Sequence, residues 1–173
     1  ISLTIKFGNS LLGSFFAWLG IFLAIICDNS RILLTSDPQQ PSTPKLVLKL
    51  LVSNDYKVTY LNELNGNHSS LLHSLEFDSV HGKWDASFKL DNEKISINKK
   101  VIQSTFSKNI ENLDLNNIDI LIDCTGAHNN SSDLKKYFDK GVKKVVVSAP
   151  VNEENIANIA YGVNQNIYNP NKH

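Results

Sequence analysis

Three short polar segments follow runs of apolar residues in this chain, and these segments are where chemistry is expected. They are Asn62-Glu63 after KVTYL, Asp123-Cys124-Thr125-Gly126 after IDILI, and Ser148-Ala149-Pro150 after VVV. Ligands of open parallel sheets bind beyond the carboxyl ends of the strands. If the apolar runs are such strands, the three segments lie at one edge of a sheet and form one binding site.

The residue types in these segments suit a dinucleotide. Glu63 can accept hydrogen bonds from the two ribose hydroxyls of NAD, and it repels a 2′-phosphate; a solvated loop glutamate is the structural alternative. The Thr125 hydroxyl and Gly126, which permits close approach of the backbone, suit a cofactor phosphate or the nicotinamide side. Ser148 ends its strand, where it is available to a ligand or to ordinary loop hydrogen bonding.

The cysteines and histidines give no sign of catalysis or of metal binding. No histidine is placed to act as a base for Cys124, and a cysteine beside a buried strand usually packs. Cys27 and Cys124 cannot form a zinc cluster, and the five histidines show no ligand spacing. His81 stands beside a turn glycine, where a structural role is commoner than that of a general base. We therefore expect neither a catalytic residue nor a metal site.

The elements around the polar segments alternate between helix and strand. Apolar spacing and composition predict helices over 45–53, 69–77 and 131–140, and strands over 57–62, 84–90, 94–98, 118–123 and 145–147. Ser131 or Ser132 is expected to cap the third helix, and Gly141 to end it. A strand, a helix, a glycine and a strand in this order indicate a βαβ unit. The sequence therefore predicts an α/β fold with a parallel sheet.

The first 44 residues have a different character. The stretch 11–27 contains no charged residue and is close to the length of about 20 residues that a membrane span needs. A secretory signal and a buried helix are its alternatives. Prolines at positions 38, 41 and 44 favour a linker over 28–44. We therefore predict an atypical amino-terminal segment over 1–44 and a domain over 45–173.

Composition narrows the class of protein. A hydrophobic content of 42% and a charged content of 20% fit a folded globular chain. Lys and Arg number 17 and so do Asp and Glu, so the balance gives no reason to expect nucleic acid as a partner. The cysteine usage suits a reducing compartment. We expect a cytoplasmic protein, with a membrane-anchored one, held through 11–27, as the alternative.

Four motifs in order resemble one family. FDSVHGKW (77–84), DCTG (123–126), KKVVVSAP (143–150) and YGVN (161–164) are similar to the amino-terminal, NAD-binding half of the phosphorylating (type I) glyceraldehyde-3-phosphate dehydrogenases. The resemblance covers residues 45–173. Within the family, GVKKVVVSAPVNEE and GVNQNIYNP are most similar to the branch encoded beside arsenate-resistance genes.

The resemblance implies roles for the candidate residues. Asn62 and Glu63 match an Asn-Asp pair whose acidic residue binds ribose, Thr125 and Gly126 match a Thr-Gly pair near the nicotinamide, and Ser148 matches a serine that contacts the cofactor. The family, a homotetramer, oxidises glyceraldehyde 3-phosphate with NAD through a cysteine thioester. The sequence stops before the family's Ser-Asn-Ala-Ser-Cys-Thr-Thr segment. We therefore expect a fragment without dehydrogenase activity, with a non-catalytic nucleotide-binding module as the alternative.

Several features depart from the family pattern. His128 stands where many members have an aromatic residue that sandwiches adenine, and 104–112 lacks the usual Arg-Asp-Pro segment. The family's first strand is followed by GFGRIGR, whose glycines and helix amino terminus hold the pyrophosphate. Here 3–9 resembles that strand and 45–48 resembles the helix. We therefore expect a partial Rossmann-type sheet with an interrupted first βα unit, and we interpret 10–44 as translated intron or another gene-model artefact.

Overall fold

The fold is taken from a computed structural model that describes residues 2–6, 30–36, 42–78, 82–151, 153–154, 156–160, 163–169 and 171–172. The apolar stretch 11–27 and His81 lie outside these residues. Among the helices that are described, none combines the length and the apolar character needed to cross a membrane.

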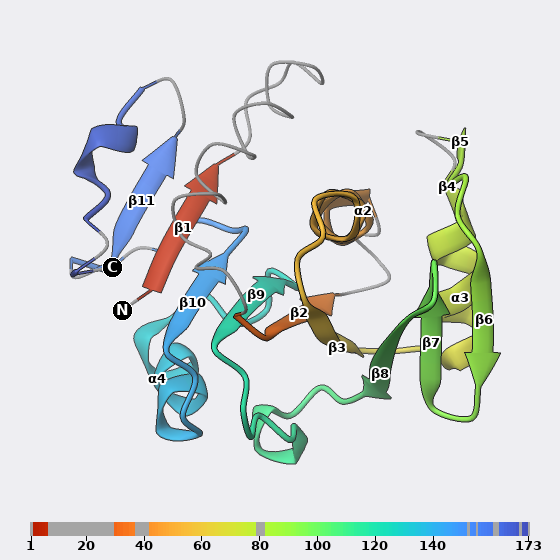
Figure 1. Ribbon diagram of the computed structural model, residues 1–173. Coiled ribbons are helices and arrows are strands. Elements are labelled where there is room, and N and C mark those ends of the chain that lie inside the picture. Colours follow the sequence, from red (N-terminus) through yellow and green to blue (C-terminus); the bar gives the residue numbers. More distant parts are fainter. Residues whose placement is uncertain are drawn as a thin grey trace.

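A nine-stranded sheet forms the centre of the molecule, in the order β11-β1-β10-β9-β2-β3-β8-β7-β6 (Figure 1). Its strands are β1 (Ser2–Lys6), β2 (Ile32–Ser36), β3 (Val58–Glu63), β6 (Phe88–Asp91), β7 (Lys94–Ile97), β8 (Lys100–Phe106), β9 (Ile120–Cys124), β10 (Lys144–Val147) and β11 (Ala157–Ala160). The pairs β6·β7 and β7·β8 are antiparallel, and all other neighbours in this sheet are parallel. The predicted α/β fold with a Rossmann-type parallel sheet is confirmed.

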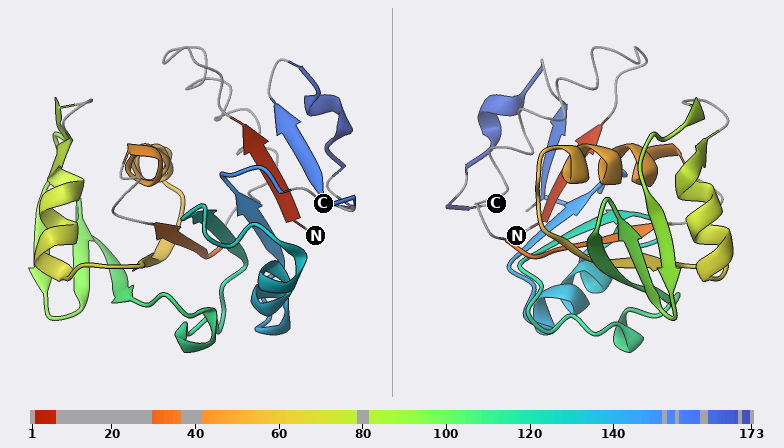
Figure 2. Two further views of the ribbon diagram at one scale, coloured as in Figure 1. Left: turned by 180° about the vertical axis from the view of Figure 1, so that it is seen from behind. Right: turned by 45° about the vertical axis from the view of Figure 1, so that its right-hand side comes forward.

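Helices cover both faces of the sheet, which gives three layers (Figure 2). The helices α2 (Ser42–Ser53) and α3 (His68–Glu76) pack on one face, with Leu34, Leu48, Leu61 and Leu71 in the same apolar cluster. The helix α4 (Ser131–Asp139) and the 3-10 turn η1 (Ile110–Asn112) pack on the other, where Leu33, Leu121, Leu134 and Tyr137 are buried together. A two-stranded ribbon of β4 (Phe77–Asp78) and β5 (Gly82–Lys83) and a second 3-10 turn, η2 (Gln165–Ile167), complete the described elements.

The cap of α4 differs from the prediction by one residue. Asn130, and not Ser131 or Ser132, is the N-cap, and its Oδ1 accepts a hydrogen bond from the N–H of Asp133 at 3.0 Å. Asn and Ser are about equally good in this position, so the residue types alone do not choose between neighbours. Gly141 follows the helix with φ of +93°, in the left-handed region that the prediction requires.

The prediction of a linker over 28–44 is wrong for β2. Ile32 and Leu33 are fully buried, and the strand pairs in parallel with β3 on one side and β9 on the other. The prolines do not prevent this, because Pro38 and Pro41 come after the strand in the sequence. Pro44 lies in the first turn of α2, where the missing N–H costs no intrahelical hydrogen bond. The run ILLTS is therefore free to form a buried strand.

The strand predicted at 3–9 forms over Ser2–Lys6, but it does not take the place of the family's first strand. It pairs with β10 and β11, on the far side of β9 from β3. The position beside β3 and β9 belongs to β2, so the first βα unit of the sheet begins at Ile32 and continues into α2. Residues Ile32–Ser36 thus form part of the sheet. The interpretation of 10–44 as translated intron or another gene-model artefact stays a prediction.

The burial of β2 predicts a large effect of truncating its side chains. Leu33→Ala removes a side chain with no exposed surface and should lower the free energy of unfolding by about 2–5 kcal/mol. Leu90→Ala is the matched control, because Leu90 is 40% exposed; its loss should stay below about 1 kcal/mol. Urea unfolding of the full chain measures both values. Equal losses for the two variants would place β2 outside the core.

Candidate dinucleotide-binding site

The polar segments predicted to form the site lie at the carboxyl ends of the strands, near the point where the order in which the chain adds strands to the sheet reverses. From β2 the chain passes outward to β3 and β8, and it then returns to form β9 on the opposite side of β2. Ligands of open α/β sheets bind beyond the carboxyl ends of the strands at such a switch point. The carboxyl ends of β2, β3 and β9 therefore define the candidate site.

The register of the strands divides the candidate residues between two faces. One row across the sheet contains Asp123, Thr35, Asn62 and Thr105, and the next row contains Cys124, Ser36, Glu63 and Phe106. Successive side chains of a strand point to opposite faces. The first row therefore lies on the face covered by α4, and the second on the face covered by α2 and α3. The sequence placed Asn62, Glu63 and Asp123 at one edge correctly, but it did not separate the two faces.

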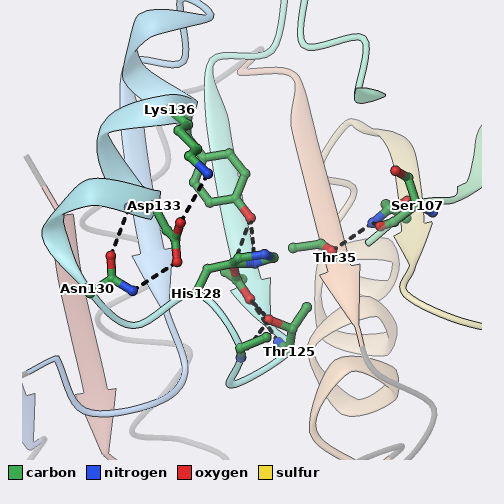
Figure 3. A network of polar contacts seen from close by, with 11 residues as sticks. Thr35, Ser107, Thr125, His128, Asn130, Asp133 and Lys136 are labelled. Atoms are coloured by element: carbon green, nitrogen blue, oxygen red, sulfur yellow. Dashed lines mark hydrogen bonds and ion pairs between the residues drawn. The ribbon is translucent and has the colours of Figure 1, made fainter. Parts of the chain in front are cut away.

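Asn62 ties three strand ends together. Its side chain is 1% exposed. Its Nδ2 donates to Thr35 Oγ1 at 3.1 Å and to the Ser107 carbonyl at 3.0 Å, and its Oδ1 accepts from Thr105 Oγ1 and the Ser107 N–H, both at 3.0 Å (Figure 3). A primary amide has two donor hydrogens and two acceptor lone pairs, so these four bonds use its full capacity. These bonds hold the carboxyl ends of β2, β3 and β8 together, and the predicted direct contact of Asn62 with the cofactor stays a prediction.

Glu63 lies at the carboxyl end of β3 with 6% of its surface exposed. The following turn closes over its carboxylate because Gly66 has no side chain. Gly66 has φ of +112°, and a Cβ atom there would stand 3.1 Å from Glu63 Oε2 and 3.0 Å from Ser70 Oγ. Any other residue would therefore be strained and would displace the carboxylate.

A pocket of about 60 Å³ opens beside Glu63. Its lining combines the polar residues Ser36, Lys45, Asn62, Glu63 and Ser74 with the apolar residues Leu34, Pro44, Leu48, Leu61, Leu71 and Leu75. Pockets that enclose a whole drug-sized ligand are roughly 300–1,000 Å³. This pocket is therefore large enough for only a part of such a ligand.

On the other face, Asp123 holds the loop that follows β9. Asp123 is fully buried. Its Oδ1 accepts from the Thr125 N–H at 2.8 Å and from Thr125 Oγ1 at 2.6 Å, and Thr125 Oγ1 accepts in turn from the Ala127 N–H at 3.0 Å. Its Oδ2 accepts from the Tyr137 hydroxyl at 2.9 Å and lies 3.1 Å from His128 Nδ1. These contacts fix the Thr125-Gly126 segment at the edge of the sheet.

The charge of this cluster follows from its hydrogen bonds. The bond to Asp123 raises the pKa of His128 above its ordinary value, against the opposing effect of burial. Burial and the neighbouring carboxylate raise the pKa of Tyr137, so its hydroxyl stays protonated and donates to Asp123. The cluster therefore favours an imidazolium ring paired with a buried carboxylate.

Cys124 and Ser148 lie at neighbouring strand ends. Burial raises the pKa of the Cys124 thiol, which is 2% exposed, so it lacks the thiolate that a nucleophile needs. The Ser148 N–H donates to the Asp123 carbonyl at 2.8 Å, which places Ser148 beside the loop after β9. In the part of the chain that is described, no group of three or more His, Cys, Asp or Glu residues could hold a metal ion.

The sequence placed Asp123 in a candidate segment without predicting that it anchors the following loop, and it did not indicate Tyr137 or Gly66 as neighbours of the site. Asp123 was visible as the polar residue that ends an apolar strand, and Gly66 as the glycine shortly after Glu63. The sequence did not single out Tyr137, because its position on the apolar side of α4 is the one expected of any core residue.

The bonds of Asn62 predict the effect of replacing it. Asn62→Leu leaves buried polar partners on β2 and β8 without a bond, and it should lower the free energy of unfolding by about 1–3 kcal/mol. Asn166→Leu is the control, because Asn166 is exposed in η2 and should change stability by about 0.5 kcal/mol or less. Thermal or urea unfolding measures both. An Asn62→Leu variant as stable as the control would show that these bonds do not hold the strand ends.

Comparisons with known proteins agree with this geometry. Residues 44–131 match the family model described as glyceraldehyde 3-phosphate dehydrogenase, NAD binding domain. The glyceraldehyde-3-phosphate dehydrogenase of Heyndrickxia coagulans is 38% identical over 130 residues, which are 73% of this chain and 38% of the relative. That of Geobacillus stearothermophilus is 36% identical over 125 residues, 71% of this chain and 37% of the relative.

The matched region includes four of the five predicted site residues, Asn62, Glu63, Thr125 and Gly126, whereas Ser148 lies after it. Glyceraldehyde-3-phosphate dehydrogenase 3 of Nostoc sp. is 32% identical over 121 residues, 69% of this chain and 36% of the relative. The chain thus spans less than two fifths of the length of these relatives, and the assignment to the arsenate-associated branch stays a prediction. Since the family model covers half of the chain, this protein belongs to the glyceraldehyde-3-phosphate dehydrogenase family through its NAD-binding domain, whose cofactor is NAD.

Proposed function

We propose that this chain binds NAD at the carboxyl ends of β2, β3 and β9, as the cofactor-binding part of a glyceraldehyde-3-phosphate dehydrogenase. The observation that supports this most directly is the placement of Glu63. Its buried carboxylate ends the strand next to the switch point, beneath a glycine turn and beside a pocket. This is the position from which an acidic residue accepts hydrogen bonds from the ribose hydroxyls of a dinucleotide.

The remaining site residues would hold the other parts of the cofactor. Ser36 shares the pocket with Glu63 and supplies a hydroxyl on the same face. Thr125 and Gly126 follow β9 and are fixed by Asp123, so they present a rigid loop edge to a ligand at the switch point. Ser148 follows β10 on the side away from Glu63. When NAD is bound, it supplies the hydride acceptor, and these residues bind and orient it.

The charge of Glu63 also bears on the choice of cofactor. A carboxylate at the ribose position favours the 2′-hydroxyl of NAD, since it repels the 2′-phosphate of NADP. Lys45 lines the same pocket, but its Nζ lies 3.4 Å from the Phe77 carbonyl and is directed toward that oxygen. We therefore propose a preference for NAD over NADP.

The relatives are longer than this chain, so the activity of a whole enzyme of the family is proposed separately. We propose that the chain serves the NAD-dependent oxidation of glyceraldehyde 3-phosphate in a longer, cytoplasmic, homotetrameric enzyme, with phosphate or arsenate as co-substrate. Cys124 does not supply the thioester-forming thiol of that reaction, because it is buried and its pKa is raised. The contribution of residues 45–173, together with β2, is to bind the cofactor.

Glu63→Gln tests the proposal directly. Hydrogen bonds to a charged group contribute about 1.5–3 kcal/mol, so the variant should bind NAD at least about tenfold more weakly in calorimetry. The unaltered chain should bind NAD with saturation and more tightly than NADP. Glu93→Gln is the control, because Glu93 is exposed in the turn between β6 and β7 and its removal should leave NAD affinity unchanged. No saturable NAD binding, or equal affinity of the two variants, would contradict the proposal.

A further inference from the structure

His128 lies at the switch point with one ring nitrogen anchored. Its Nδ1 is 3.1 Å from Asp123 Oδ2 and 3.1 Å from the Tyr137 hydroxyl. Figure 3 shows the ring reaching from the loop after β9 toward Thr35, which is paired in register with Asp123. Among the residues that the structure describes, none forms a hydrogen bond with Nε2. The side chain is 13% exposed. The unanchored edge of the ring is thus the one that can meet a ligand.

The sequence between β2 and α2 contains no glycine. A glycine loop presents several backbone N–H groups to the pyrophosphate. Residues 37–41 read DPQQP, which contains no glycine, and its two prolines have no N–H. A side-chain donor near this segment can therefore supplement the backbone N–H groups at the start of α2.

We propose that His128 binds a phosphate of the dinucleotide through Nε2–H, as a replacement for the backbone donors of a glycine loop. The inference rests on the proposed function and adds a specific residue to it. It accounts for the switch-point position of the ring, for the anchoring of Nδ1, and for the absence of glycine from 37–41.

The surroundings of the ring determine when this bond can form. Asp123 from β9 and Asp133 from α4 favour the imidazolium, whereas Lys136 from α4 opposes it. Lys136 is itself paired with Asp133 at 3.3 Å and with Glu111 at 3.1 Å, and Tyr137 is neutral. When the ring loses its proton, Nδ1–H stays bonded to Asp123, so Nε2 becomes an acceptor that a phosphate oxygen repels. Binding is therefore strong below the pKa of His128 in the folded chain and weakens above it.

The packing of the ring argues against a stacking role with adenine. His128 and Tyr137 are in edge contact, with ring centroids 5.9 Å apart and planes at 86°. Together with the bond to Asp123, this contact buries most of the ring. A stacking residue needs an open face, whereas a phosphate needs only the exposed nitrogen.

Calorimetry of the full chain at about pH 6 and about pH 9, on either side of the ordinary histidine range, provides the test. NAD should bind about tenfold more tightly at the lower pH. His128→Gln, which retains a donor toward Asp123 but has no charge, should remove this pH dependence and bind NAD about tenfold more weakly at the lower pH. Adenosine, which has no phosphate, should bind equally to both proteins. His73→Gln is the control, because His73 is exposed on α3.

The outcomes separate this inference from the proposed function. If NAD and adenosine both bind and His128→Gln changes neither, NAD binding stands and the role of His128 is overturned. If neither ligand binds, both proposals fail. If the variant does not fold, the unaltered chain is titrated with inorganic pyrophosphate instead. The readout is the pH dependence of the ring resonances of His128 in NMR, with and without pyrophosphate. We expect the ligand to raise the pKa of His128, and unchanged resonances would overturn the inference.

Discussion

The pairing of β2 between β3 and β9 is the interaction on which the rest of the structure depends. It buries Ile32 and Leu33 completely and aligns three strand ends in one register. The rows that result bring Asn62 beside Thr35, and Glu63 beside Ser36. Without this strand the carboxyl ends of β3 and β9 would have no common edge, and the groups proposed to bind NAD would be far apart.

The two rows give the site two unlike halves. On the α2 face, a carboxylate beneath Gly66 borders a small apolar pocket, which suits neutral hydroxyl groups. On the α4 face, Asp123 is enclosed by Thr125, His128 and Tyr137, which is a network of buried polar bonds that includes a histidine with a raised pKa. A dinucleotide has a neutral ribose and anionic phosphates, so in the proposed binding mode the two halves of the site meet chemically different parts of the ligand.

The sequence predicted the region around β9, α4 and β10 well, because an apolar run, a capped helix and Gly141 leave few alternatives. It failed at β2, because prolines on the following residues obscured a strand of only five residues. The sequence also could not predict that Ser2–Lys6 pairs with β10 and β11, since a short strand does not specify its neighbours in a sheet. Asn62 was predicted to be a site residue, but its bonds depend on β8, which the sequence analysis did not identify as a strand.

The proposed binding of NAD at the carboxyl edge of the sheet around β2 is tested most directly by amide chemical-shift mapping of the full chain during titration with NAD. We expect saturable changes that are largest at Ser36, Glu63 and Gly126, with none at Arg31 and Asp119, which pair with each other at the opposite edge. Changes centred on Arg31 and Asp119, or no saturable changes, would contradict it.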